Sequence, residues 1–224
     1  GAAHRRQAKR AAGGRGMIFA RYVLPLVALL GAPLPAQASQ SPERVTAEGL
    51  AELHEYSRCV VFNRPTQARQ VLAMDPETPR FNEALTGLIH RLNGCTHGRL
   101  AANQLLFVGS LAEQLLKRQG NLDLASATAH NPSRPALRAR DEADYMAMCL
   151  VRAQPSKVAD LFDARPGSAE EGAAVTAIQP HLAGCMTAGQ SMRLNRAGLR
   201  AVLAWASFRL INHNSAPAAA AARD

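Results

Sequence analysis

The sequence has few aromatic residues and few lysines. Aromatic side chains make up 4% of the 224 residues, and only three of the 26 basic residues are lysine. A shortage of aromatics disfavours a surface on which single-stranded nucleic acid stacks its bases. The preference for arginine is typical of a GC-rich genome. We therefore do not expect nucleic acid to be a partner.

The sequence also lacks a complete reaction motif. HEYSR begins like a zinc-protease helix at His54 and Glu55, but Arg58 stands where the second histidine is needed. In GQSMR, Ser191 lies as in a nucleophile elbow, but Arg193 replaces the closing glycine. A phosphate loop, a dinucleotide fingerprint and a calcium loop are all missing. We expect no catalytic residue, no metal and no cofactor, and favour a binding protein over an enzyme.

The first 38 residues have the pattern of an export signal. They carry six basic residues and no acidic one. After Met17 and Arg21 comes a charge-free apolar stretch, 22–35, followed by AQA at 36–38, which has the small-x-small form of a signal peptidase site. The apolar stretch is short for a bilayer span. We predict cleavage after Ala38, with an uncleaved anchor as the alternative.

This prediction divides the N-terminal segment and changes the charge. We expect residues 1–16 to be upstream sequence or a basic leader and 17–38 to be the signal peptide, with the true start, Gly1 or Met17, left open. Removing 1–38 lowers the formal net charge from +9 to +3, because six basic residues leave with it. We expect a periplasmic or secreted chain without a membrane span after cleavage.

The remaining sequence contains the same pattern twice. When Cys59 is aligned with Cys149, nine of 37 columns are identical as far as Cys95 and Cys185. The identical columns hold prolines, a glycine, cysteines and apolar residues, which are structural types. After a two-residue insertion, Asn103 and three further positions match the second copy. The pattern predicts an internal duplication.

Each copy is predicted to be helical. Leu50, Leu53, Ser57 and Val60 recur at helical spacing, and Pro65 ends that helix and begins the next. Capping residues precede a third helix in both copies, and Ser168 with Glu171 forms a capping-box pattern. In the last helix of the second copy, five apolar residues recur at 3–4 spacing: Leu199, Val202, Leu203, Ala206 and Leu210.

These patterns predict an all-α fold with two tandem copies of a three-to-four-helix unit. The first copy takes residues 39–118 and the second 142–214. The polar segment between them, 119–141, is predicted to be a linker or an irregular excursion. The Ala-rich tail, 215–224, is predicted to be disordered.

The four cysteines are predicted to form two disulfides. An exported protein meets an oxidising compartment, where cysteine pairs persist. Three connectivities are open, and the duplication favours Cys59–Cys95 and Cys149–Cys185, one in each copy, over a cross-braced pairing. Such a loop contributes on the order of 4 kcal/mol in the chain-entropy account.

Other roles for the cysteines have weaker support. Cys95 and His97 are the only closely spaced pair of metal-ligand types, and Thr187 occupies the matching position in the second copy. A cysteine nucleophile with His90 or His181 stays open. However, both histidines lie in the last turn of a predicted helix, where a basic residue suits the helix dipole.

Three arginines are candidate contacts for an anionic partner. Arg193, Arg196 and Arg200 are predicted to lie on one side of the last helix, where they would meet a phosphate, a lipopolysaccharide or an anionic membrane face. The alternative is an ordinary solvated helix face, because this charge density is common.

The leader, the repeated C…P…P…GC pattern and the apolar helix RAGLRAVLAWASFR resemble uncharacterised exported proteins of Gram-negative bacteria. The resemblance implies a compartment and two cysteine-bracketed helical copies, and no activity. We therefore expect a periplasmic binding or interaction module whose partner is an envelope protein, a peptide or an anionic surface component. The alternative is an unrecognised periplasmic hydrolase with a site between the copies, for which His54, Glu55 and His90 would have to meet.

Overall fold

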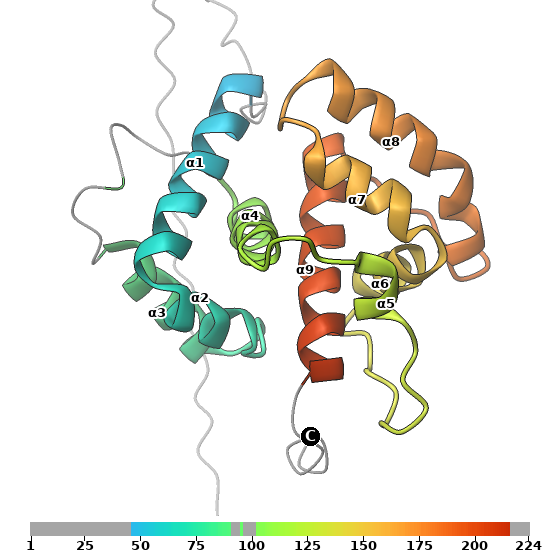
Figure 1. Ribbon diagram of the computed structural model, residues 1–224, viewed down its shortest axis with the longest axis horizontal. Coiled ribbons are helices and arrows are strands. Elements are labelled where there is room, and N and C mark those ends of the chain that lie inside the picture. The colour runs from blue at the N-terminus through green and yellow to red at the C-terminus, as the bar shows by residue number, and fades with distance from the viewer. Residues whose placement is uncertain (1–45, 91–94, 96–101, 216–224) are drawn as a thin grey trace, which may run out of the picture. The chain divides into compact units, whose positions relative to one another are not determined.

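Figure 1 shows the computed structural model, which describes residues 46–90, 95 and 102–215. In these residues all regular structure is helical and no strand occurs, so the all-α prediction is confirmed. The described helices are α1 (Ala47–Asn63), α2 (Pro65–Leu72), α3 (Pro79–His90), α4 (Gln104–Lys117), α5 (Leu124–Thr128), α6 (Glu142–Ala153), α7 (Pro155–Asp163), α8 (Ala169–Leu182) and α9 (Arg196–Ser215), with a 3₁₀ turn at Ala183–Cys185. The predicted leader, signal peptide and tail beyond Ser215 lie outside these residues, as does the predicted helix-ending Gly94.

Proline breaks set the boundaries between the first helices, as predicted. α1 ends at Asn63; its C-cap residue Arg64 has φ −137° and ψ 54°, and Pro65 then begins α2. α6 ends at Ala153; its C-cap residue Gln154 has nearly the same backbone angles, φ −136° and ψ 50°, and Pro155 begins α7. Proline suits the first helical turn because its missing N–H has no helical partner there.

The predicted disulfides are confirmed. Cys59 in α1 pairs with Cys95, and Cys149 in α6 pairs with Cys185 in the 3₁₀ turn, each across a separation of 36 residues. The Cα atoms are 5.6 Å apart in the first pair and 5.5 Å in the second. Each disulfide therefore ties the first helix of a predicted copy to the segment that follows the third.

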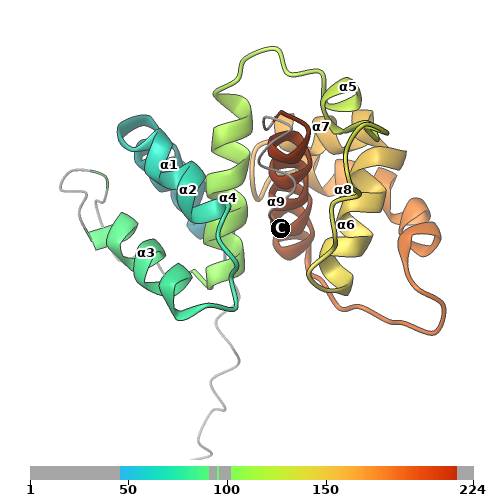
Figure 2. The same cartoon turned by 90° about the horizontal axis from the view of Figure 1, so that it is seen from below.

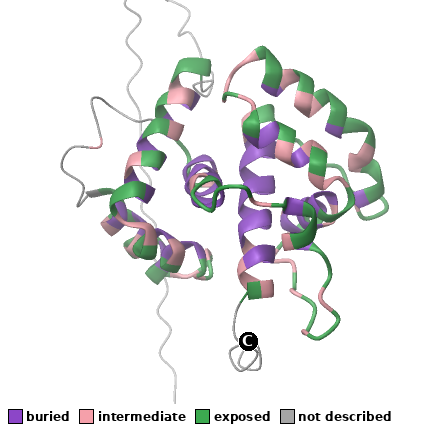
Figure 3. Ribbon diagram, viewed as in Figure 1, coloured by how far each residue is buried: buried purple, intermediate pink, exposed green. Residues whose placement is uncertain are grey.

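α9 is the helix around which the core is built. It contacts α4, α5, α6 and α7, and it is buried on nearly all of its faces between Gly198 and Ile211 (Figure 3). The predicted apolar stripe is therefore only part of its buried surface. A helix that is apolar all round belongs inside a fold, whereas a stripe belongs at its surface.

α4 crosses α9 steeply (Figures 1 and 2), and the two helices touch where Gly109 meets Ala201. A Cβ atom on Gly109 would overlap the backbone of Ala201. Only glycine permits this approach. The contact places the middle of α4 directly against the first half of α9, where Arg200 lies.

The segment 119–141 is held against the C-terminal end of α9. Asn214 donates to the carbonyls of Ala127 (2.9 Å) and Ala129 (3.0 Å), and Arg209 donates to Arg138 O at 3.0 Å. The segment includes the short helix α5, which the sequence did not predict. The irregular excursion is thus fixed in place at both α5 and the residues that follow it.

None of the helices in the described part of the chain is long and apolar enough to cross a membrane.

Candidate functional site

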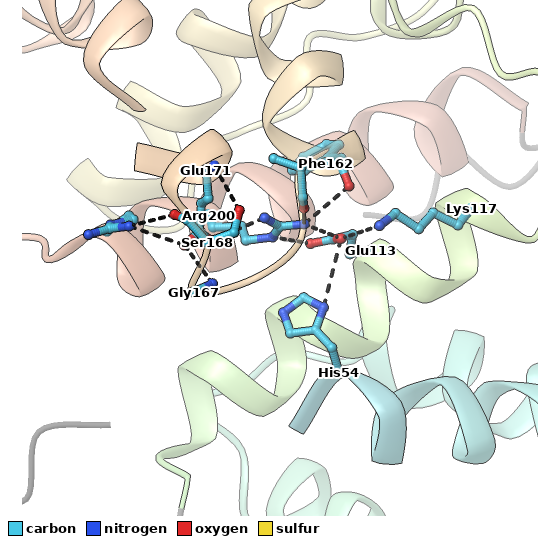
Figure 4. Close-up of polar contacts among 10 residues, drawn as sticks. His54, Glu113, Lys117, Phe162, Gly167, Ser168, Glu171 and Arg200 are labelled. Carbon is cyan, nitrogen blue, oxygen red and sulfur yellow. Dashed lines mark hydrogen bonds and ion pairs between the residues drawn. The ribbon is translucent and has the colours of Figure 1, made fainter. Parts of the chain in front are cut away.

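Arg200 lies at the centre of a buried ionic cluster between α4, α8 and α9 (Figure 4). It is 2% exposed. Its Nε and Nη2 atoms each donate to a different oxygen of Glu113 at 2.7 Å, which is a bidentate ion pair. Nη1 donates to Glu171 at 3.1 Å, and Nη2 also donates to the carbonyls of Phe162 (3.1 Å) and Ala164 (2.9 Å). All three guanidinium nitrogens are therefore engaged.

Glu113 comes from α4 and is fully buried. Its Oε1 accepts a second charged contact from Lys117, one turn later, at 2.8 Å. Burial acts to raise the pKa of Glu113, but the hydrogen bonds and charge of Arg200 outweigh burial and lower that pKa. The same bonds to Glu113 overcome burial at Arg200 and raise its pKa. Both groups are therefore charged at neutral pH.

Glu171 connects the cluster to the turn before α8. Ser168 caps α8 by accepting a bond from Glu171 N at 3.2 Å, as the capping-box pattern predicts. The Glu171 carboxylate instead accepts from Gly167 N at 2.9 Å and from Arg200. Gly167 has a positive φ of 79°, and an added Cβ would lie 2.7 Å from Ala47 Cα. The turn therefore rests directly on the start of α1.

His54 reaches the cluster from α1 as a neutral side chain. Burial lowers the pKa of His54 to about 4, although the Glu113 charge acts in the opposite direction. Its Nδ1 lies 3.8 Å from Glu113 Oε1, which is too long for a hydrogen bond. Nδ1 has no hydrogen-bond partner within the described residues. At neutral pH this contact is therefore not an ion pair.

The cluster has no room for a substrate. The gap beside His54, Ser110 and Glu113 has a volume of about 10 Å³. A single water needs roughly 10–15 Å³. Because the charged groups are buried and satisfy one another, their arrangement is suited to holding α4, α8 and α9 in register and not to chemistry on a bound molecule.

A much larger cavity lies beside α8 and the start of α9. Its volume is about 490 Å³, within the range of small-molecule sites. Seven of its twelve lining residues are aliphatic or thioether: Met146, Val175, Leu182, Met186, Met192, Leu194 and Leu199. The polar lining is Thr176, Gln179, Asn195 and Arg196. These side chains include no carboxylate, imidazole or thiol, so the cavity offers apolar contact and one cation.

Arg196 joins the cavity to the ionic cluster. It is the first residue of α9, after the N-cap Asn195, whose side chain accepts from Gly198 N at 2.8 Å. Arg196 Nη1 donates to Ser168 O at 3.0 Å and lies 4.0 Å from Glu171 Oε2. About half of its side chain is exposed, at 48%. The turn before α8 thus fixes one end of the guanidinium and leaves the rest accessible.

The three predicted contact arginines do not share one surface. Arg193 precedes α9 and is exposed, and Arg196 is exposed at its first residue. The prediction that Arg200 is available to a partner on a helix face is wrong, because Arg200 is buried and paired with Glu113 and Glu171. Only the first two are accessible to a partner.

α1 does not bring together His54 and Glu55, two of the three residues proposed for a hydrolase site. His54 turns inward to Glu113, whereas Glu55 pairs with Arg58 on the exposed side. The side chain of His90 and the residue His97 lie outside the described part of the chain. In that part, acidic, histidine and cysteine residues form no group able to hold a metal ion.

Sequence reasoning missed Glu113 as a partner of Arg200. The signal was an isolated charge inside an apolar run, at Glu113 in LAEQLL and at Arg200 in LRAVLAW. No protein-family model matches the chain, and no curated protein or solved structure is significantly similar to it. The resemblance to exported helical proteins therefore stays a prediction.

Proposed function

We propose that this chain is an exported binding module made of two tandem helical units, and that its ligand occupies the cavity beside α8. The observation that carries the proposal is a cavity of about 490 Å³ whose lining combines seven apolar side chains with four polar ones and contains no acid, imidazole or thiol for catalysis. Apolar pockets of this size with few polar groups are typical of ligand sites.

Duplication is supported by matching local structure. The breaks at Arg64 and Gln154 have the same backbone angles within a few degrees, and each is followed by a helix-starting proline. The disulfides have the same sequence separation, 36 residues, and tie corresponding elements. These features agree with the sequence alignment of the two copies.

Export is supported by the disulfides together with the predicted signal peptide. Both cysteine pairs are formed, and the described part of the chain has no free cysteine. Structural disulfides persist mainly in oxidising compartments such as the periplasm. N-terminal sequencing of protein recovered from the periplasm should begin at or beside Ser39. Recovery only in the cytosol with residues 1–38 intact would contradict export.

A small ligand fits the described surface better than a protein partner does. The large apolar side chains exposed there, Phe62, Ile89 and Tyr145, lie on three different helices. Single exposed apolar residues are ordinary on soluble folds. The alternative, a hydrolase between the copies, gains no support, because the polar groups at that place are buried around a gap of about 10 Å³.

Titration with a neutral apolar fluorescent probe, N-phenyl-1-naphthylamine, tests the proposed site. The wild-type protein should enhance the probe's fluorescence with saturation. Val175→Trp fills the cavity and should weaken binding at least tenfold. Ala177→Trp, at an exposed position on the same helix outside the lining, is the matched control and should bind as the wild type does. Equal binding by Val175→Trp, or none by the wild type, would refute the site.

A further inference from the structure

We propose that the cavity binds a single-chain anionic amphiphile, with its aliphatic chain among the methionines and its acid group on Arg196. The inference rests on the proposed binding function and names the ligand class for the same site. Three features carry it: the composition of the lining, the accessible donors of Arg196, and the balance of charge behind that residue.

The lining suits a flexible aliphatic chain. Three of its residues are methionines, Met146, Met186 and Met192, and the other apolar residues are valine or leucine. Unbranched thioether side chains adapt to the shape of an apolar guest. The lining contains no aromatic ring, so an aromatic ligand would gain apolar contact there but no stacking, and a nucleobase would lose both its stacking and its polar partners.

Arg196 provides accessible donors beside this apolar surface. Nη1 is occupied by Ser168 O, but Nε and Nη2 have no partner among the described residues. Gly172 makes space for the guanidinium, because an added Cβ there would lie 3.3 Å from Arg196 Nη1. A planar guanidinium with two free donor groups matches a carboxylate or a phosphate.

The ionic cluster behind Arg196 leaves a positive charge in excess. Glu113 and Glu171 are its two carboxylates, and both already pair with the buried Arg200. Lys117 also pairs with Glu113. Arg196 is held 4.0 Å from Glu171 and is the cation of the group that lines the cavity. An anion can therefore bind there without meeting an uncompensated carboxylate.

Other ligand classes fit less well. The positive excess opposes a cation, including the soft Cu⁺ that thioethers can bind. An extended peptide needs many partners for its backbone, but two polar groups of the lining are already used. Thr176 Oγ1 donates to Gly172 O at 2.9 Å, and Asn195 Oδ1 accepts from Gly198 N at 2.8 Å.

The test compares amphiphiles that share one chain and differ in the head group. Decanoate, decyl phosphate, decanol and decyltrimethylammonium are titrated below their critical micelle concentrations, by calorimetry and by displacement of the fluorescent probe. Decanoate or decyl phosphate should bind about 10-fold more tightly than decanol, as expected for one charge-assisted contact. The cationic amphiphile should bind most weakly. The tighter of the two anions identifies a carboxylic acid or a phosphate as the head group.

Variants separate the head group from the chain. Arg196→Gln should weaken decanoate binding about 10-fold and change decanol binding less than about twofold. Arg193→Gln removes a nearby exposed cation that does not line the cavity and should change neither. Octanoate, decanoate and dodecanoate should differ by about 3–4-fold per added methylene until the cavity is filled.

Each contrary outcome is distinguishable. Equal binding of decanoate and decanol, or an unchanged Arg196→Gln variant, would overturn the anionic ligand and leave the apolar site standing. Preference for decyltrimethylammonium over both anions would also overturn it. If neither the probe nor any amphiphile binds, the proposed function fails together with this inference.

Discussion

Two of the contacts that join α9 to the rest of the fold are held by opposite chemistry. At one, Arg200 is paired with Glu113 and Glu171 in a buried ionic cluster. At the other, Trp205 stacks with Phe81, with ring centroids 6.3 Å apart and an interplanar angle of 20°. The Arg140 guanidinium covers the indole at 3.5 Å from the ring centroid.

The proposed duplication makes these two contacts equivalent. The sequence alignment pairs Glu113 with Trp205 and Glu171 with Phe81. Each contact also ends on a matching backbone carbonyl: Arg200 donates to Phe162 O at 3.1 Å, and Trp205 Nε1 donates to Leu72 O at 3.4 Å. The alignment pairs Leu72 with Phe162 as well.

The difference shows that similar arrangements of helices can be stabilised either by buried ion pairs or by aromatic packing. A buried ion pair costs desolvation and succeeds only when every charge is satisfied. An aromatic stack gains its energy from buried area and tolerates small displacements. We infer that the ionic contact fixes which faces of α4, α8 and α9 meet, whereas the aromatic contact supplies packing.

Removing the arginine should have the largest effect. Arg200→Leu leaves Glu113 and Glu171 buried without their cation, and we expect the free energy of unfolding to fall by about 3–5 kcal/mol. Urea denaturation followed by circular dichroism measures it. A triple variant, Arg200→Met with Glu113→Leu and Glu171→Leu, removes all three charges and should be clearly more stable than Arg200→Leu. If the triple variant is the less stable of the two, the account of unpaired charge is wrong.

Acid should weaken the ionic contact before it weakens the aromatic one. The pKa of His54 is about 4 in the fold against 6.5 in the unfolded chain. Below pH 6.5 the unfolded chain therefore binds a proton that the fold excludes, and stability falls as pH falls towards 4. The maximum slope is about 1.4 kcal/mol per pH unit.

Urea midpoints at pH 7.0, 6.0, 5.0 and 4.5 measure this slope. His54→Gln does not titrate there and should give a flatter profile. Glu113 has a lowered pKa, so its own loss of stabilisation begins near its ordinary value of 4.5 and is shared by both proteins. Parallel profiles for the two proteins would show that His54 is not buried as a neutral group.

A conservative change at the aromatic contact should have a smaller effect. Trp205→Phe keeps a ring against Phe81 but removes the indole N–H bond to Leu72 O. We expect a loss of about 1–2 kcal/mol, from one hydrogen bond and part of the buried area. Equilibrium urea unfolding measures it. A loss as large as that of Arg200→Leu would show that both contacts depend on a buried polar group.

The smallest expected effect is a difference in the rate at which the two disulfides are reduced. Cys59 and Cys95 are both partly exposed, and exposed Asn63 donates to each sulfur, whereas Cys185 is only 4% exposed. Access governs thiol–disulfide exchange. We expect dithiothreitol to reduce Cys59–Cys95 several-fold faster than Cys149–Cys185. Timed alkylation and peptide mapping follow each pair; faster reduction of the second pair would contradict this.

Local signals explain what the sequence predicted well. Pro65 and Pro155 begin helices because their lost N–H costs nothing there, and Ser168 caps α8 through its own side chain. The disulfide pairing followed from the equal cysteine spacing in the two predicted copies. Each of these features is decided within a few residues or by a repeated pattern.

The sites depend on contacts that no local pattern encodes. Arg200 and Glu113 are 87 residues apart, and their pairing requires a particular rotation of α4 and α9. The sequence pattern predicts that the charged Arg200 lies on a solvent-facing side of α9. In the structure four neighbouring helices bury nearly every face of α9, and the sequence of one helix does not show how its neighbours will pack. α5 was missed because five residues are too few to show a helical period.

The position of α9 at the end of the described chain has a consequence for biogenesis. If the chain is exported as proposed, a translocon delivers the N-terminal part first, so α4 and α6 emerge before the helix on which both pack. Until α9 arrives, Glu113 has no Arg200, and the apolar faces of two helices stay uncovered. Folding of the core would then wait until α9 has emerged, and until that point an envelope chaperone would find these apolar surfaces uncovered.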